Sequence, residues 1–148
     1  MSALTKLYLF AYNSLQAIGW ATAFLIISNN FISTKSLNEA YASAGELICL
    51  LQIIGFLEVI HGALGIVPTG VLLPFMQWGG RTHFVLAIVR KITEVQKLPS
   101  VFITFVAWSL AEVSFLVIIF IIQTVIVFSW PVCLWLRNAT IALHFKME

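Results

Sequence analysis

Four long apolar stretches occupy most of this 148-residue chain and leave only short polar segments between them. The stretches cover residues 7–28, 47–67, 71–90 and 101–128. About 20 consecutive apolar residues in a helix are enough to cross the hydrocarbon core of a bilayer. The sequence therefore predicts an all-α fold, a polytopic bundle of transmembrane helices.

The composition is incompatible with a soluble domain. Apolar residues make up 61% of the chain and charged residues 9%, whereas soluble domains contain roughly 45–50% and 25% of these. The net charge is +2 and the basic residues are scattered, so a nucleic-acid partner is not expected. Both cysteines, Cys49 and Cys133, lie inside apolar runs and are expected to be small buried residues. We therefore expect membrane lipid around the chain, no metal site and no cofactor.

The third apolar stretch allows two interpretations. It contains Pro74 and is interrupted by the Gln-Trp-Gly-Gly-Arg segment at residues 77–81. One interpretation is a single kinked span with Arg81 facing the bundle. The other is a pair of half-length pieces in a re-entrant arrangement. Each interpretation gives a different membrane orientation, and the distribution of Lys and Arg over the loops does not determine which orientation the chain adopts.

Ionisable side chains interrupt the apolar stretches at Glu58, His61 and Glu112. A basic residue or Asp at the centre of a membrane helix costs about 2.5–3.5 kcal/mol on insertion scales, so ionisable groups in spans are candidates for function. Hydrogen bonding between helices, with a purely structural role, is the alternative for all three.

Three of the predicted spans gather their polar, aromatic and small residues on one face, at about 100° of rotation per residue. These residues are Tyr8, Tyr12, Gln16, Gly19 and Trp20 in the first span, Gly55, Glu58, His61, Gly62 and Gly65 in the second, and Thr104, Trp108, Ala111 and Glu112 in the fourth. The pattern is typical of a bundle with a polar interior and an aliphatic outer surface. For Tyr8 and Trp20 we favour the aromatic belt at the membrane interface.

Four short motifs follow one another between residues 12 and 112. They are Tyr12-Asn13 with Gly19-Trp20, the Leu-Glu-x-x-His-x-x-x-Gly-x-Val segment at residues 57–67, Gln77-x-x-x-Arg81, and Trp108-Ser-x-x-Glu112. In order and spacing they resemble the 3-hydroxyacyl-CoA dehydratase family of very-long-chain fatty-acid elongation. The resemblance covers residues 5–113 and is strongest to plant members.

This family is also called protein-tyrosine-phosphatase-like, but the sequence excludes phosphatase chemistry. A phosphatase of that kind needs a thiolate nucleophile and a cationic group for phosphate. In the matching segment, Gly62 stands at the position of the Cys and Pro68 at that of the Arg.

The resemblance implies a multi-pass enzyme of the endoplasmic-reticulum membrane with six spans. It implies removal of water from a (3R)-3-hydroxyacyl-CoA to give the trans-2-enoyl-CoA, with an acyl-CoA substrate and other elongation enzymes as partners. Gln77 and Arg81 are the substrate-binding candidates. Arg81 suits the phosphates of CoA, and an ordinary snorkelling arginine is the alternative.

The acid and base of this family come from a Tyr-Pro-x-Gly-x-x-x-Glu motif, which the sequence lacks. Its three tyrosines are Tyr8, Tyr12 and Tyr41, and none of them precedes a proline. No catalytic residue is assigned. We expect residues 1–113 to be the N-terminal part of a dehydratase-like membrane domain, and residues 114–148 to be an unrelated hydrophobic tail.

The sequence thus predicts a member of the dehydratase family that is truncated and inactive alone. The alternative is a non-catalytic membrane partner or regulator of the elongation complex. A small proton-coupled carrier using Glu58, His61 and Glu112 is a third class, for which no paired half-repeats are evident.

Overall fold

Helices follow one another through the part of the chain that the structure, a computed structural model, describes: residues 3–114 and 117–118. Residues 1–113 and 114–148 are separate units, and the description below concerns the first. Its helices are α1 (Ala3–Thr34), α2 (Ala40–Ala63), α3 (Leu72–Thr82), the π-helix η1 (His83–Val89), the short α4 (Thr93–Gln96) and a helix that begins at Pro99 and is described as far as Ser114. No β-strand occurs among the described residues.

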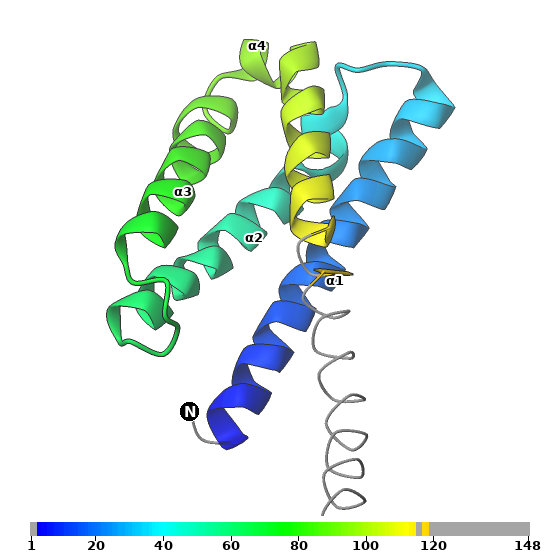
Figure 1. The fold of residues 1–148 in the computed structure, drawn as a ribbon. Helices are drawn as coiled ribbons and strands as arrows, with labels where there is room; N and C mark the ends of the chain where they lie inside the picture. The colour runs from blue at the N-terminus through cyan, green and yellow to red at the C-terminus, as the bar shows by residue number, and fades with distance from the viewer. Residues whose placement is uncertain (1–2, 115–116, 119–148) are drawn as a thin grey trace, which may run out of the picture. The chain divides into compact units, whose positions relative to one another are not determined.

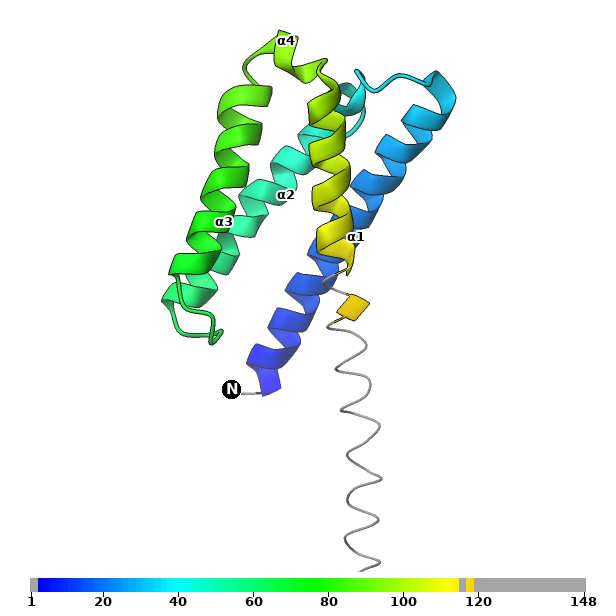
Figure 2. The same ribbon diagram turned by 45° about the horizontal axis from the view of Figure 1, so that its top comes forward.

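Successive long helices run in opposite directions, as Figures 1 and 2 show. The connection after α1 and the α4 segment therefore lie at one end of this unit, and the N-terminus and the connection after α2 lie at the other. Both α1 and α3 pack against α2. Helix α1 ends where Lys35 adopts a left-handed conformation, with φ of 56°, and donates its backbone N–H to Phe31 O at 2.8 Å.

Helix α2 ends four residues before the predicted end at Val67, so that boundary was wrong. Gly65 has a φ of 66°. The backbone N–H of Gly65 bonds to Gly62 O at 3.2 Å, and that of Ile66 bonds to His61 O at 2.9 Å. This pair of bonds around a left-handed glycine is the Schellman motif, which terminates helices. Gly65 therefore stops the helix, and the predicted polar face ends at Gly62.

The connection after α2 folds back closely onto the helix. A Cβ atom built on Gly62 would lie 2.2 Å from the carbonyl oxygen of Gly70, and Gly70 itself has a φ of 68°. The backbone of the connection can approach α2 only because residue 62 has no side chain.

We expect Gly62→Ala to destabilise this unit by about 1–3 kcal/mol, the usual cost of overpacking. The added methyl group would displace backbone atoms of the connection, which outweighs the higher helix propensity of Ala. Thermal unfolding of the detergent-solubilised chain measures the effect. Gly80→Ala is the matched control, because nothing lies within 4 Å of a Cβ at that position. Equal melting temperatures for the two variants would contradict the close approach.

The third apolar stretch forms one continuous helical segment, since α3 runs directly into η1. Pro74 is the third residue of α3, in the first turn, where a helix needs no N–H donor from that residue. The backbone N–H of Arg90 bonds to Val85 O at 2.8 Å, five residues back, as in a π-helix. Of the two interpretations, the structure has the single segment, with a change from α to π geometry in place of a proline kink.

The core lies where α1, α2, η1 and the Pro99–Ser114 helix meet. Its buried apolar residues are Trp20, Ala23, Ile27, Ala40, Ala44, Ile48, Cys49, Leu51, Val85, Val89, Val101 and Phe105. Trp20 is only 3% exposed, so its expected place in an interfacial belt was wrong. Small residues in this set allow the helices to approach closely, as is usual for helices packed in membranes.

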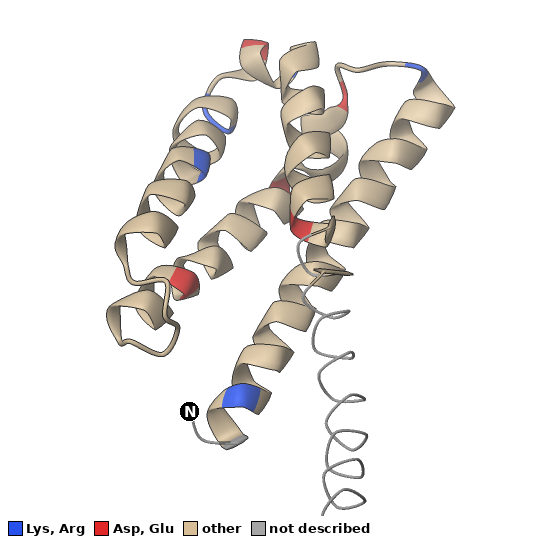
Figure 3. Ribbon diagram, viewed as in Figure 1, with Lys and Arg blue, Asp and Glu red and all other residues tan. Residues whose placement is uncertain are grey.

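Large apolar side chains cover the outside of α1 at intervals of three, seven or eight residues. They are Leu4, Leu7, Leu15, Ile18, Leu25 and Ile32. Among the described helices, Leu4–Thr34 of α1 and Ala40–Ala63 of α2 are long and apolar enough to cross a membrane. Figure 3 shows long uncharged stretches of ribbon between the few charged positions. The predicted fold class, an all-α bundle suited to a membrane, is confirmed.

Candidate functional site

The predicted polar faces of the first two spans lie against each other. The hydroxyl oxygen of Tyr8 lies 2.9 Å from Nε2 of His61, and the rings of Tyr8 and Tyr12 stand edge-on to the imidazole with centroids 5.4 and 5.2 Å away. Tyr12 also donates its hydroxyl to Oε1 of Glu58 at 3.4 Å. Two ionisable groups of α2 thus find their partners on α1.

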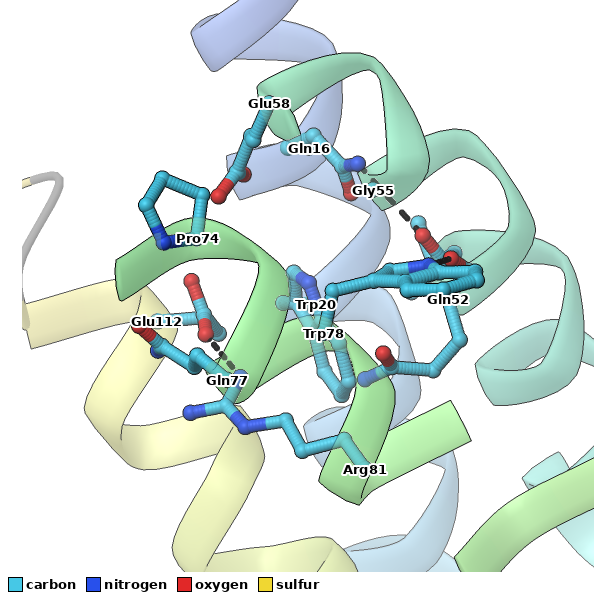
Figure 4. Close-up of a pocket in the computed structure, with 11 residues that line it drawn as sticks. Gln16, Trp20, Gln52, Gly55, Glu58, Pro74, Gln77, Trp78, Arg81 and Glu112 are labelled. Atoms are coloured by element: carbon cyan, nitrogen blue, oxygen red, sulfur yellow. Dashed lines mark hydrogen bonds and ion pairs between the residues drawn. The ribbon is translucent and has the colours of Figure 1, made fainter. Parts of the chain in front are cut away.

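A pocket opens beside this contact, between α1, α2, α3 and the Pro99–Ser114 helix (Figure 4). Its wall consists of Gln16, Trp20, Leu51, Gln52, Gly55, Glu58, Pro74, Gln77, Trp78, Arg81 and Glu112. Four of the five residues singled out from the sequence belong to it: Glu58, Gln77, Arg81 and Glu112. The fifth, His61, is not in the wall and lies against the tyrosines of α1.

Arg81 and Glu112 form an ion pair across the pocket, from Nη1 of the guanidinium to Oε1 of the carboxylate. Their side chains are 19% and 22% exposed. The guanidinium also lies over the indole of Trp108, with its central carbon 5.4 Å from the ring centroid, a favourable cation–π distance. Pairing explains how both charges are accommodated within apolar helices.

Two residues of the pocket wall, Gln52 and Trp78, were not identified as site residues from the sequence. The indole N–H of Trp78 donates to the backbone carbonyl of Gln52 at 2.8 Å and joins α3 to α2. Gln52 is 4% exposed. Gln52 could have been found from the sequence, because it is an amide inside an apolar run. It precedes Gly55 by three residues and therefore lies on the polar face of the same helix.

Six of the eleven residues in the pocket wall are polar or charged, and convergent polar groups of this kind orient ligands in small-molecule sites. The wall contains two carboxylates, one guanidinium and the amides of three glutamines. Among the described residues, no three His, Cys, Asp or Glu side chains lie close enough together to hold a metal ion. Such a wall can position a polar ligand group by hydrogen bonds while an attached hydrocarbon chain contacts apolar side chains.

Comparison with known proteins identifies the family of this helical bundle. The model of the family described as protein tyrosine phosphatase-like protein, PTPLA, matches residues 52–144, which is more than half of the chain. The chain belongs to this family. The match crosses Val113, where a boundary between two parts was predicted from the sequence.

Curated relatives carry the name very-long-chain (3R)-3-hydroxyacyl-CoA dehydratase. The chain is 29% identical to the protein of that name from Danio rerio over 136 residues, 90% of this chain and 37% of the relative. It is 27% identical to dehydratase 3 of Mus musculus over 93% of this chain and 38% of the relative. It is 29% identical to dehydratase 2 of Homo sapiens over 74% of this chain and 43% of the relative.

The chain therefore spans about two-fifths of the length of the curated relatives that it matches. No solved structure matches it. The likeness to plant members stays a prediction.

Proposed function

We propose that this chain is a multi-pass protein of the endoplasmic-reticulum membrane that supplies the substrate pocket of a (3R)-3-hydroxyacyl-CoA dehydratase in very-long-chain fatty-acid elongation. The observation that carries the proposal is the pocket itself, where Glu58, Gln77, Arg81 and Glu112 come together from three helices. Family membership and the names of the relatives supply the substrate class. Its proposed partners are an acyl-CoA, other elongation enzymes and membrane lipid.

Dehydration of a 3-hydroxyacyl thioester requires a base for the proton on C2 and an acid for the hydroxyl that leaves C3. The pocket presents polar groups that can orient such a substrate. Residues 1–148 contain no tyrosine followed by proline. In the proposal, residues 1–148 therefore bind and orient the substrate. The proton transfers are performed by the Tyr and Glu of the family's motif, which these residues do not supply.

For Arg81 we propose a role other than binding the phosphates of CoA. As a substrate-binding residue it would contact the phosphates of CoA, but its guanidinium is already paired with Glu112 and lies over Trp108. It also lies ten residues into the 18-residue segment formed by α3 and η1. Arg81 therefore lies about 12–14 Å from each end of this segment, at a rise of 1.5 Å per residue. Fixing Glu112 in the pocket wall is the role that these contacts support.

Binding of 3-hydroxyacyl-CoA to the purified chain in detergent tests the proposal. We expect Gln77→Ala to weaken binding roughly 2- to 10-fold, the worth of one net hydrogen bond. Leu73→Ala is the matched control, because Leu73 is exposed on the same helix and is absent from the pocket wall. Absence of binding to the wild-type chain would reject the proposal, and equal affinities of the two variants would remove Gln77 from the site.

A non-catalytic partner or regulator of the elongation complex is the second candidate, favoured by the missing Tyr-Pro-x-Gly-x-x-x-Glu motif in these 148 residues. It differs from the first in a measurable way. A regulator would co-purify with other elongation enzymes and change their rate without binding a 3-hydroxyacyl-CoA in its own pocket.

A further inference from the structure

The amide of Gln16 carries a buried acceptor that no described residue satisfies. Gln16 lies on α1 in the pocket wall and is 6% exposed. Its Oε1 has no hydrogen-bond partner among the described residues. Buried polar atoms without partners are rare in native proteins because leaving them unpaired is costly. This oxygen is the unsatisfied acceptor of the pocket wall.

The contacts of the amide nitrogen establish which atom lacks a partner. Nε2 lies 3.4 Å from the backbone oxygen of Leu51 and 3.2 Å from the hydroxyl of Tyr12. The Leu51 carbonyl can only accept a hydrogen bond, so the amide atom that faces it has to be the NH₂ group. The orphaned atom is therefore the oxygen, and it requires a donor.

Three donors near Gln16 are already engaged with other partners. The Trp78 indole N–H is bonded to the Gln52 carbonyl, and the Arg81 guanidinium is paired with Glu112. The hydroxyl of Tyr12 donates to Glu58 while it accepts from Gln16. A donor for Gln16 Oε1 can come from a molecule that enters the pocket.

Gly55 leaves room for such a molecule beside Gln16 (Figure 4). A Cβ atom on Gly55 would lie 3.9 Å from Gln16 Nε2 and 3.8 Å from Trp78 Cδ1, both ordinary van der Waals distances. A methyl group would therefore fit without forcing the wall apart and would fill space between the amide and the indole. The glycine keeps this part of the pocket open.

We propose that Oε1 of Gln16 accepts a hydrogen bond from a hydroxyl group of the bound ligand, and that the space left by Gly55 beside the amide nitrogen admits that ligand. This inference rests on the proposed function, in which that hydroxyl is the one on C3 of the acyl chain. The trans-2-enoyl product has no such hydroxyl. Gln16 therefore distinguishes substrate from product, and loss of its hydrogen bond favours release of the product.

The experiment compares ligands that differ only in the hydroxyl. A 3-hydroxyacyl-CoA and the saturated acyl-CoA of equal length are titrated into the 148-residue chain in detergent, together with the corresponding thioesters of N-acetylcysteamine, which lack CoA. The wild-type chain is expected to bind each hydroxylated ligand about 5- to 10-fold more tightly, as one hydrogen bond allows.

Variants assign the preference to Gln16. Gln16→Met is expected to abolish it without weakening the saturated ligands. Gly55→Ala is expected to weaken binding of the hydroxylated ligands selectively. It provides a second test of the proposed ligand site if Gln16→Met does not fold. Gly80→Ala, outside the pocket wall, should leave every affinity unchanged.

The outcomes separate this inference from the proposed function. Equal affinities of hydroxylated and saturated ligands in the wild-type chain would mean that water satisfies Gln16, and would overturn the inference while leaving acyl-CoA binding intact. A hydroxyl preference among the N-acetylcysteamine thioesters without any CoA ester binding would support the inference and reject the proposed function. Binding of none of the four ligands would overturn both.

Discussion

Residues 1–148 by themselves are not expected to dehydrate a 3-hydroxyacyl-CoA, whereas a chimera of residues 1–113 with the C-terminal half of a curated dehydratase is expected to do so. A positioned acid or base typically contributes 10²–10⁴-fold to a rate. The motif that supplies both in this family is absent from these residues, since Tyr8, Tyr12 and Tyr41 are the only tyrosines. Activity of the 148-residue chain should therefore lie near background.

Complementation of cells that lack their own dehydratase measures this difference. Both proteins are expressed at matched levels, and the enoyl-CoA product is quantified in membranes. Rescue by the chimera alone would support the proposal that residues 1–113 form a working substrate pocket. Rescue by the 148-residue chain would contradict the expectation that this chain is inactive by itself. It would direct attention to Glu58 and His61, which contact Tyr12 where α1 and α2 meet.

Helical periodicity was sufficient to predict the polar faces of α1 and α2, which contact each other in the structure. Tyr8, Tyr12 and Gln16 share one face of α1, and the structure places that face against Glu58 and His61. The prediction succeeded because side chains three or four residues apart lie on the same side of a helix. Polar groups in an apolar helix also need partners, and these are available only on other helices.

Features that depend on the path of the chain between helices could not be predicted in the same way. The pairing of Arg81 with Glu112 joins residues 31 positions apart, and no local pattern specifies it. The early end of α2 depends on one glycine in a left-handed conformation, Gly65, within a run whose apolar composition continues to Val67. His61 shares a face with Glu58, yet it lies against the tyrosines of α1 and outside the pocket wall.

Breaking the ion pair between Arg81 and Glu112 is expected to have the second large effect, this time on stability. Removing one partner of a buried pair typically costs 3–5 kcal/mol because it leaves the other charge uncompensated. The two side chains keep about a fifth of their exposure, so we expect Glu112→Leu to cost about 2–3 kcal/mol, below the range for fully buried pairs. Arg81→Met should cost a similar amount, since it leaves the carboxylate unpaired.

The double variant Arg81→Met/Glu112→Leu is expected to recover most of the stability lost in either single variant. It removes both charges and leaves apolar side chains of similar size, a replacement that is often neutral or stabilising. Unfolding of the detergent-solubilised chain gives the four free energies, and their double-mutant cycle isolates the coupling between the two residues.

The exposed pair of Arg90 and Glu46 serves as the control for this cycle. Its atoms are 3.0 Å apart, but the side chains are 46% and 67% exposed, so its coupling should not exceed about 1 kcal/mol. Additive losses at Arg81 and Glu112 would show that the pair contributes no coupling of its own. Arg81 would then be free to bind a phosphate, and Glu112→Leu would leave affinity for acyl-CoA intact. A strong coupling would instead mean that the charge of Arg81 is neutralised inside the bundle, where it orders the pocket wall and leaves hydrogen bonding to a ligand to the neighbouring amides.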